Sequence, residues 1–376
     1  MDSQAQTLSS ELAESSQRRL SNQQSKYKLT YSVGVSETMN NKYRPTMEDV
    51  HTYVENFVER LDWGYFAIFD GHAGKQAAKW CGQHLHSIVE RRIIENESED
   101  VRNILNESFI ETDSEIVGEV KGSSGCTAAV AVIRWELPDQ ALNTTASQKN
   151  TPTNPGLEGH KRMLYTANVG DTRIILFRDG KAIRLTYDHK ATDKNEVERI
   201  EQKGGLVMKS RVNGMLAVTR SLGDKFFKDL VIGNPYTTSI ELDSTRDKFM
   251  IIACDGLWDV ISDQKACELI QNITDANAAA QTLVKYALDH FTTDNVTVSK
   301  SLAVAAAAAA AAAAVAVVAA AAQPAAFSVF PVGCLLSFAP VAFHKHPSLS
   351  LSQKFSSYLV ESSTGLMRHR IASLSH

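Results

Sequence analysis

Two apolar runs that each end in Asp-Gly constrain the fold of this chain most strongly. Residues 64–69 read Gly-Tyr-Phe-Ala-Ile-Phe and are followed by Asp70-Gly71. Residues 249–254 read Phe-Met-Ile-Ile-Ala-Cys and are followed by Asp255-Gly256. Runs of β-branched and aromatic residues predict buried strands. We therefore expect each strand to end at an exposed carboxylate, which places two acidic side chains at strand ends.

Two further acidic clusters suggest a shared cation site. Asp294-Asn295 leads into a short apolar run, and Glu48-Asp49 follows Arg44. Each dipeptide alone is also an ordinary turn, because Asp and Asn bond nearby backbone and Gly tolerates positive φ. Taken together they supply several hard oxygen donors, which suit Mg²⁺ or Mn²⁺ rather than the softer metals that bind Cys and His. Arg44 adds a cation that can bind phosphate, although a surface ion pair with Glu48 is the simpler interpretation of that residue alone.

Composition excludes several classes of protein. With 376 residues, 43% of them hydrophobic, the chain can build a large core, and its length allows two domains. A net charge of −4 offers no excess of positive charge for nucleic acid. The N-terminus lacks the apolar core of a signal peptide, so we do not expect secretion. The cysteines are odd in number and lack paired short spacings, which indicates a reducing compartment without a disulfide framework or a zinc site: Cys81, Cys126, Cys254, Cys267 and Cys334.

Periodicity divides the chain into elements. Residues 1–26 are polar and predict a disordered lead. Residues 136–161 lack periodicity and predict a loop insertion, and residues 208–235 predict an irregular surface loop. Predicted strands cover 27–35, 53–58, 127–135, 163–169, 173–177, 182–186, 238–242 and 249–254, with 163–169 and 173–177 forming a hairpin around Gly170-Asp171 and the last two strands lying in a second sheet. Predicted helices cover 73–96, 100–120, 195–202, 264–272 and 276–290.

Ordered short motifs carry a resemblance to a known family. The motifs are Arg44 with Met47-Glu48-Asp49, Phe69-Asp70-Gly71-His72-Ala73-Gly74, Ser124-Gly125-Cys126-Thr127-Ala128, Gly170-Asp171-Thr172-Arg173, Asp188-His189-Lys190, the segment 216–224, the segment 254–259 and Asp294-Asn295. In this order they resemble the metal-dependent serine/threonine protein phosphatases of type 2C, especially the short fungal members. The resemblance covers residues 27–300, which we expect to form the phosphatase domain.

The resemblance implies an α+β fold, a four-layer α-β-β-α sandwich of two mostly antiparallel sheets flanked by helices. It implies a reaction in which water, activated by two Mg²⁺ or Mn²⁺ ions, hydrolyses phosphoserine and phosphothreonine. The implied metal ligands are Glu48, Asp49, Asp70, the Gly71 carbonyl, Asp255 and Asp294, with Asp171 helping to hold a weaker third ion. Among these, Asp70 bridges the ions and Asp49 orients the attacking water. Arg44 is expected to bind the phosphate and His72 to protonate the leaving oxygen, whereas for His72 taken alone a turn histidine satisfied by backbone is the simpler interpretation.

Partners and compartment follow from the same resemblance. We expect phosphorylated proteins such as signalling kinases as substrates, a role as negative regulator of kinase signalling, a monomer, a cytoplasmic or nuclear location, and neither nucleic acid nor membrane as a partner. Two other hypotheses stay open from the residues. One is a phosphatase fold that has lost turnover and only docks a partner; the other is a two-metal nuclease, which the lack of basic surface disfavours.

The C-terminal part departs from the family pattern. Lys300 falls where a central strand favours an uncharged side chain, and burying an unpaired ammonium is expensive, so we expect a short or poorly paired last strand. An uncharged, alanine-rich run from Leu302 to Ala322 has the length of about 20 residues that spans a bilayer. Each buried methylene contributes roughly 0.8 kcal/mol of transfer free energy. Alanine buries only one methyl group, far less than leucine, so insertion of this run into a membrane is not favoured. We interpret residues 301–376 as a low-complexity, unstructured tail, with a weak membrane-binding or partner-binding helix as the alternative.

Overall fold

The computed structural model describes residues 29–136 and 160–303. The predicted lead at 1–26, the interior of the predicted insertion at 136–161 and nearly all of the predicted tail at 301–376 lie outside the described residues. Within the described part, no helix has both the length and the apolar character needed to cross a membrane.

Two five-stranded sheets form the centre of the fold. The first sheet has the order β13-β7-β6-β3-β2, and the second has the order β1-β15-β14-β8-β9. Every neighbouring pair of strands in both sheets is antiparallel. The strands of the first sheet are β2 (Val50–Glu55), β3 (Gly64–Phe69), β6 (Ala128–Glu136), β7 (Lys161–Val169) and β13 (Tyr236–Glu241), and those of the second are β1 (Tyr31–Thr38), β8 (Arg173–Arg178), β9 (Lys181–Arg184), β14 (Asp247–Ala253) and β15 (Val296–Ala303).

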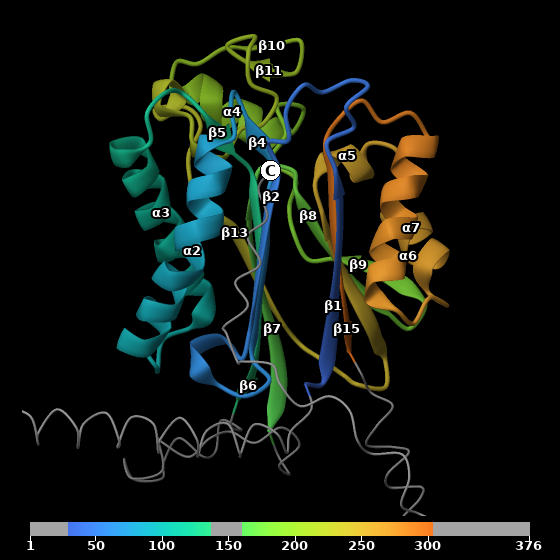
Figure 1. Ribbon diagram of the computed structural model, residues 1–376. Helices are drawn as coiled ribbons and strands as arrows, with labels where there is room; N and C mark the ends of the chain where they lie inside the picture. The colour runs from blue at the N-terminus through green and yellow to red at the C-terminus, as the bar shows by residue number, and fades with distance from the viewer. Residues whose placement is uncertain (1–28, 137–159, 304–376) are drawn as a thin grey trace, which may run out of the picture. The chain divides into compact units, whose positions relative to one another are not determined.

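Helices cover the outer face of each sheet, as Figure 1 shows. The first sheet is covered by α2 (Gln76–Glu95) and α3 (Val101–Glu119), which contact β2, β3, β7 and β13. The second sheet is covered by α5 (Asp255–Trp258), α6 (Asp263–Ile270) and α7 (Ala276–Asp289), which contact β1, β9, β14 and β15. This arrangement confirms the predicted four-layer α-β-β-α sandwich of two antiparallel sheets.

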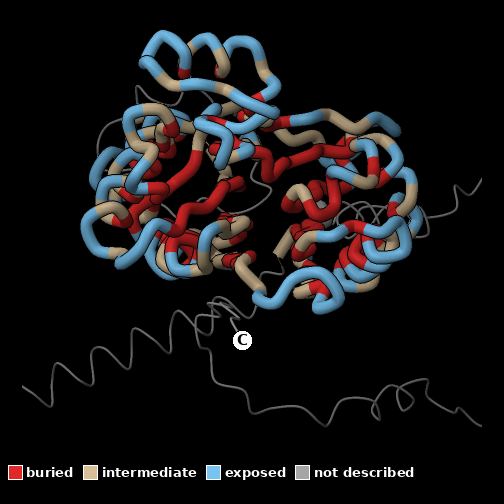
Figure 2. The backbone as a smooth tube through the Cα atoms, turned by 90° about the horizontal axis from the view of Figure 1, so that it is seen from above, coloured by how far each residue is buried: buried red, intermediate tan, exposed pale blue. Residues whose placement is uncertain are grey.

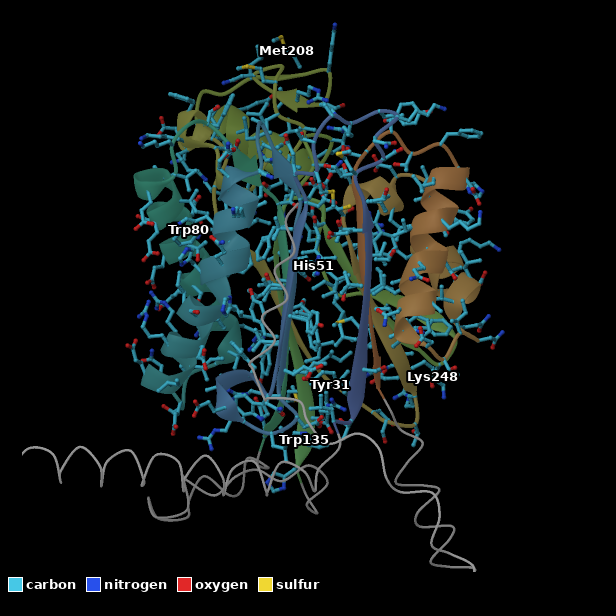
Figure 3. The ribbon with its side chains drawn as sticks, viewed as in Figure 1. Tyr31, His51, Trp80, Trp135, Met208 and Lys248 are labelled. Carbon is cyan, nitrogen blue, oxygen red and sulfur yellow. The ribbon has the colours of Figure 1, made fainter. Side chains whose placement is uncertain are left out.

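Three apolar cores hold the layers together, because the strands alternate between their two faces. In β3, Phe66 and Ile68 face the core between the sheets, whereas Tyr65, Ala67 and Phe69 face the core under α2 and α3. A third core lies between the second sheet and α5–α7. Figure 2 shows the buried backbone inside both halves and the exposed backbone in the outer loops. Across the inner layer, His51 of β2 pairs with Glu37 of β1 through an Nδ1–Oε2 contact of 2.9 Å, and Figure 3 shows His51 between the sheets.

The predicted hairpin around Gly170-Asp171 is wrong. β7 pairs with β6 and β13 in the first sheet, whereas β8 pairs with β14 and β9 in the second. The turn therefore crosses from one sheet to the other. Gly-Asp satisfies the same local backbone geometry in both cases, so turn residues alone could not distinguish a hairpin from a crossing. Residues 238–242 do not lie in the second sheet as predicted, since β13 pairs with β7 of the first sheet, whereas the predicted strand at 249–254 does lie in the second sheet as part of β14.

The prediction of a short or poorly paired last strand is also wrong. β15 runs from Val296 to Ala303 and pairs along its length with β1 and with β14. Lys300 is fully buried, but its Nζ atom donates to the Ile273 carbonyl at 2.7 Å and lies 4.8 Å from the centroid of the Phe249 ring. The ammonium is therefore not unpaired, and the strand continues through it into the part that was interpreted as tail.

The segment 208–235 is not only a surface loop. Together with α4 (Lys194–Gln202), it builds a small core of its own from Ala191, Ile200, Val212 and Val231. Its regular elements are β11 (Arg211–Val212), which pairs with β10 (Val207–Met208), a 3₁₀ turn η4 (Lys225–Phe227), and β12 (Leu222–Gly223), which joins a small sheet with β5 (Gly125–Cys126) and β4 (Gly71–His72). Figure 3 shows Met208 of this hairpin at one end of the sandwich, and Tyr31 and Trp135 at the other.

Other boundaries shift by a few residues. The first strand begins at Tyr31 rather than at residue 27, and β2 begins at Val50 rather than at residue 53. The predicted strand at 53–58 instead ends at Glu55, and Phe57–Glu59 forms a 3₁₀ turn η1 in which Val58 has a φ of 59°. That left-handed conformation cannot continue a strand.

Candidate metal centre

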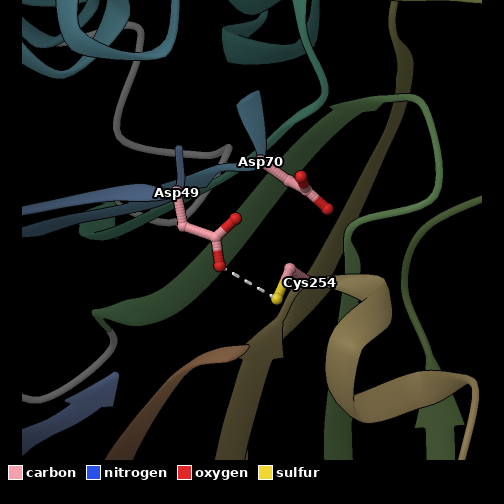
Figure 4. Close-up of side chains that lie close together, drawn as sticks. All are labelled: Asp49, Asp70 and Cys254. Atoms are coloured by element: carbon pink, nitrogen blue, oxygen red, sulfur yellow. Dashed lines mark hydrogen bonds between the residues drawn. The ribbon is translucent and has the colours of Figure 1, made fainter. Parts of the chain in front are cut away.

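Acidic side chains from both sheets meet at one end of the sandwich. Asp70 directly follows β3, and Asp49 directly precedes the neighbouring strand β2, so antiparallel pairing brings them side by side. Cys254 directly follows β14 of the other sheet. One ligand atom from each of these three residues lies within 4.8 Å of the others. Figure 4 shows this meeting point between the two sheets.

Asp49 is anchored through one of its two oxygens. Its Oδ2 atom accepts hydrogen bonds from Thr297 Oγ1 at 2.8 Å and from Cys254 Sγ at 3.2 Å. Burial raises the pKa of Asp49 to about 6, although both hydrogen bonds oppose that shift. These contacts fix the carboxylate and leave Oδ1 to face the cluster.

The remaining aspartates repel one another at positions that are mostly only partly buried. Burial, together with the charges of Asp49, Asp255, Asp171 and Asp294, raises the pKa of Asp70 well above its usual range. Burial and the charges of Asp171, Asp294 and Asp259 do the same to the pKa of Asp255. The cluster is thus electrostatically unfavourable unless cations neutralise it.

Asp255 also carries an unsatisfied atom. Its Oδ1 is buried, and no hydrogen-bond partner reaches it from residues 29–136 or 160–303. A buried polar atom without a partner costs free energy, and each such atom needs an explanation such as an ion. Hard carboxylate oxygens that repel one another are a donor set for Mg²⁺ or Mn²⁺. The residues present therefore fit a divalent metal site.

Asp294 and Glu48 join the cluster from two loops. Burial raises the pKa of Asp294 against the opposing charge of Arg44, and Glu48 contributes to the rise. Asn295 holds these loops together, because its Oδ1 accepts from the Glu48 backbone N–H at 2.9 Å and its Nδ2 donates to the carbonyls of Met39 and Thr46. The backbone at Asn295 packs closely against Gly256, and only glycine fits there, because an added Cβ would lie 1.9 Å from the Asn295 carbonyl oxygen.

Arg44 lies at the rim of the cluster. Its Nη2 atom contacts Asp294 Oδ2 at 2.5 Å and its Nε donates to the Thr293 carbonyl at 3.2 Å. The side chain is 46% exposed, so it is free to reach a ligand that approaches from solvent. The ion pair with Glu48 considered from the sequence is not the one formed, since the partner is Asp294.

His72 lies in β4 and is paired with an aspartate that is far away in sequence. Its Nε2 atom is 2.7 Å from Asp224 Oδ2, and Asp224 also accepts a hydrogen bond from Ser221 Oγ. Because a carboxylate only accepts, Nε2 carries the proton of this bond and Nδ1 stays available. A Cβ at Gly125 would lie 2.2 Å from Asp224 Oδ2 and 2.5 Å from His72 Nε2, so only glycine leaves room for the pair.

Asp171 is placed beside a lysine rather than alone. It stands in the turn between β7 and β8, and its Oδ2 atom lies 3.2 Å from Lys190 Nζ. The same ammonium lies 3.3 Å from Asp259 Oδ1. Asp255 and Asp259 are four residues apart in the turn of α5, so they project from the same side toward this lysine.

The structure brings together Arg44, Glu48, Asp49, Asp70, Asp171, Asp255 and Asp294, with His72 in the adjoining small sheet. Their roles as ligands, and that of the Gly71 carbonyl, stay predictions. Sequence reasoning assigned no role to Cys254, Thr297, Asp224, Lys190 or Asp259. Asp224, Lys190, Asp259 and Cys254 stood within the quoted motifs. A charged residue beside a turn was the available signal for the first three, whereas Cys254 and Thr297 have the pattern of ordinary strand positions.

Comparison with known proteins identifies what this chain is similar to. Residues 33–296 match the family model described as "Protein phosphatase 2C". The chain is 64% identical over 272 residues to Protein phosphatase 2C homolog 1 of Saccharomyces cerevisiae, covering 72% of this chain and 93% of that protein. It is 43% identical over 266 residues to Protein phosphatase 2C homolog 1 of Schizosaccharomyces pombe, covering 70% and 71%.

Solved structures support the fold. A phosphatase from a pathogenic strain of Toxoplasma gondii superimposes with a TM-score of 0.59 at 23% identity, covering 73% of this chain and 93% of that chain. A sex-determining protein of C. elegans gives a TM-score of 0.60 at 22% identity, covering 73% and 65%. Likeness at this level of identity shows the shared α-β-β-α architecture.

Proposed function

We propose how this chain works from the premise that it belongs to the protein phosphatase 2C family. It is a metal-dependent phosphatase that hydrolyses phosphoserine and phosphothreonine in proteins, and metal dependence in this family generally means Mg²⁺ or Mn²⁺. We propose in addition which residues hold the ions, orient the water, bind the phosphate and donate the proton. This proposal is supported above all by the buried Asp255 Oδ1, which no hydrogen-bond partner reaches from the described residues, inside a cluster of mutually repelling carboxylates.

We assign two ions to the acidic cluster. Asp70 would hold both ions, Glu48 and the Gly71 carbonyl would hold one of them, and Asp255 and Asp294 would hold the other. A weaker third ion belongs to Asp171. When bound, the ions supply a water of lowered pKa and offset negative charge on the phosphoryl oxygens.

Asp49 orients the attacking water. Its Oδ2 is held by Thr297 and Cys254, which leaves Oδ1 as the acceptor for a water proton. A carboxylate fixed by two donors keeps its direction during the reaction, so little reorganisation is needed. Asp49 thereby acts on the water, whereas the other aspartates of the cluster supply ligand oxygens.

Arg44 binds the phosphate of the substrate. Its guanidinium can make two parallel hydrogen bonds to phosphate oxygens, which an ammonium cannot reproduce. Its exposed fraction and its position beside Asp294 put it at the entrance of the cluster. A phosphate bound there would take the place of Asp294 as the partner of the guanidinium.

His72 protonates the leaving serine or threonine oxygen. Asp224 holds the imidazole through Nε2, so Nδ1 is the atom that delivers the proton. An imidazole ring can carry and release a proton at Nδ1, which makes it suited to general acid catalysis. Asp224 is a positioning residue in this scheme, because it acts through His72.

Removal of one proposed ligand tests the assignment. We expect Asp255→Asn to lower hydrolysis of a phosphothreonine peptide with Mn²⁺ by more than about 100-fold, because even outer-shell partners of metal ligands contribute 10–100-fold. Mn²⁺ binding, followed by titration calorimetry on the full chain, should lose its tight component. Asp289→Asn is the matched control, since Asp289 is an exposed residue of α7 that pairs with Lys285. Activity within threefold of wild type in Asp255→Asn, or full activity after chelation, would overturn the assignment.

The alternative of a docking module without turnover has lost its basis. It was motivated by a disrupted last strand beside Asp294, and β15 is paired on both sides. The nuclease alternative has no support from the comparisons.

Signalling kinases remain the substrates that we propose, in the cytoplasm or nucleus, with the protein as a negative regulator and a monomer. Support comes from the action of the family on phosphorylated proteins. Quantitative phosphoproteomics after acute depletion tests it, and unchanged activation-loop phosphorylation would argue against it.

A further inference from the structure

Lys190 occupies a position inside the acidic cluster that the reaction scheme leaves unused. Its Nζ atom lies 3.2 Å from Asp171 Oδ2 and 3.3 Å from Asp259 Oδ1. Its charge also acts on Asp255, whose Oδ1 has no hydrogen-bond partner among the described residues. One ammonium therefore faces three carboxylates, two of which belong to the proposed ligand set.

The backbone of Lys190 is fixed on both sides, so only its side chain can move. His189 N–H donates to the Gly170 carbonyl at 2.9 Å, and Ala191 N–H donates to the Ala217 carbonyl at 3.0 Å. The lysine side chain is 33% exposed and has a four-carbon stem with several rotatable bonds. It can therefore leave the carboxylates without disturbing the chain around it.

Asp259 connects this position to solvent. Its side chain is 61% exposed, and it lines an open groove of about 590 Å³ together with Trp258 and Asp263. A hydrated ion can thus reach the Asp259 carboxylate from solvent, and the partly exposed Lys190 ammonium can move out into solvent when the ion binds. Asp171, by contrast, is 7% exposed, so a positive charge beside it offsets the cost of burying its carboxylate.

We propose that Lys190 is a resident cation that competes with a divalent ion for Asp171 and Asp259 and so sets the affinity of that ion. This inference rests on the proposed metal ligands. An ammonium and a divalent ion cannot share the same oxygens at contact distance, because like charges repel strongly where solvent is limited. The ion can therefore bind only when the Lys190 side chain leaves. The free energy needed to break the lysine contacts lowers the affinity of the site for the ion.

Mn²⁺ binding to the metal-stripped full chain tests the competition. In wild type we expect a tight and a weak class of Mn²⁺ sites by titration calorimetry. In Lys190→Met, which keeps the stem and removes the charge, the weak class should bind at least fivefold more tightly while the tight class changes less than twofold. Lys190→Gln is the second variant if the first does not fold, and Lys190→Arg, which keeps the charge, should stay near wild type. Lys285→Met is the matched surface control, because Lys285 also pairs with an aspartate.

The outcomes separate this inference from the proposed function. If Asp255→Asn abolishes tight Mn²⁺ binding but Lys190→Met leaves the weak class unchanged or weaker, the competition is wrong and the metal assignment stands. If wild type binds no Mn²⁺, both fail. A weak class that tightens in both Lys190→Met and Lys190→Gln, and not in Lys285→Met, supports the competition.

Discussion

The Nε2 atom of His72 lies 2.7 Å from Oδ2 of Asp224, although 152 residues separate them in the chain. The pair forms because β4 and β12 both join β5 in one small sheet, and Gly125 of β5 leaves space between them. Asp224 adopts a left-handed φ of 48°, a conformation that Asn tolerates as well as Asp. Asp224→Asn therefore removes the negative charge beside His72 and keeps the backbone conformation.

We expect Asp224→Asn to slow hydrolysis of a phosphothreonine peptide by about 10-fold to 100-fold in kcat, with little change in KM, because general acid catalysis contributes 10²–10⁴-fold. Hydrolysis of p-nitrophenyl phosphate, whose leaving group needs no proton, should fall less than about threefold. Steady-state kinetics with both substrates measures the contrast. Equal losses on the two substrates would show that Asp224 acts on the fold and not through His72.

Glu196 on α4 holds the segment 219–220 through a dense set of donors. Its Oε1 accepts from Arg220 at 2.6 Å, and its Oε2 accepts from Arg199 and from Thr219 Oγ1, both at 2.9 Å. Burial opposes the charge, but the hydrogen bonds from Arg220 and Arg199 outweigh it and lower the pKa of Glu196 to about 2. Glu196→Gln should lower the free energy of unfolding at pH 7 by about 3 kcal/mol, since one pKa unit corresponds to 1.36 kcal/mol.

The pH dependence of Glu196 has a definite sign. Because the pKa of Glu196 is lower in the folded state than in the unfolded chain, its carboxylate stabilises the folded state. This stabilisation is fully present above the unfolded pKa of 4.5 and declines as pH falls toward 2. The difference between wild type and Glu196→Gln should thus shrink by about 2 kcal/mol between pH 7 and pH 3 in urea unfolding. Glu198→Gln, exposed on the same helix, is the control and should change little. A difference that stays constant with pH would contradict the assignment.

Strand ends and helices were predictable here because their signals are local. The Asp-Gly ends of β3 and β14 follow from apolar runs that stop at a turn, and α3 and α7 follow from apolar spacing. Those signals also located Asp70 and Asp255. Where they lie relative to each other depends on which strands pair, and pairing is not a local property.

Long-range packing explains the failures. Gly170-Asp171 looks the same whether the chain turns back within a sheet or crosses to the other one. Lys300 looked incompatible with a central strand, because its partners, the Ile273 carbonyl and the Phe249 ring, come from other elements. Asp224 and Lys190 gained roles only when folding placed them beside His72 and Asp171.

Phe291 lies two residues after the end of α7, in a backbone conformation that favours glycine. Its φ is 61° and its side chain is 77% exposed, so strain is not repaid by burial. Phe291 N–H donates to the Leu288 carbonyl and Thr292 N–H to the Ala287 carbonyl, the pattern of a Schellman motif with Phe291 at the left-handed position. Phe291→Gly should raise the free energy of unfolding by about 0.5–1 kcal/mol. Phe291→Ala, which keeps the Cβ, should not, and equal effects of the two in chemical denaturation would contradict the strain.

Lys300 makes the stability of the sandwich depend on alkaline pH. Burial lowers the pKa of its ammonium from 10.5 to about 8, with the charge of Asp275 opposing the shift. Between pH 8 and pH 10.5 the unfolded chain binds more protons at this residue than the folded chain does, so the folded state gains stability as pH rises. Replacing the lysine by methionine removes this dependence.

We therefore expect the free energy of unfolding of wild type, relative to Lys300→Met, to rise by about 3 kcal/mol between pH 7 and pH 10.5. Using the difference cancels the titration of every other group, because both proteins share those groups. Lys285→Met, at an exposed lysine of α7, should give a difference that is flat over the same range. Should the Lys300→Met difference also be flat, the ammonium keeps an ordinary affinity for its proton, and the contacts with the Ile273 carbonyl and the Phe249 ring offset the whole cost of its burial in β15.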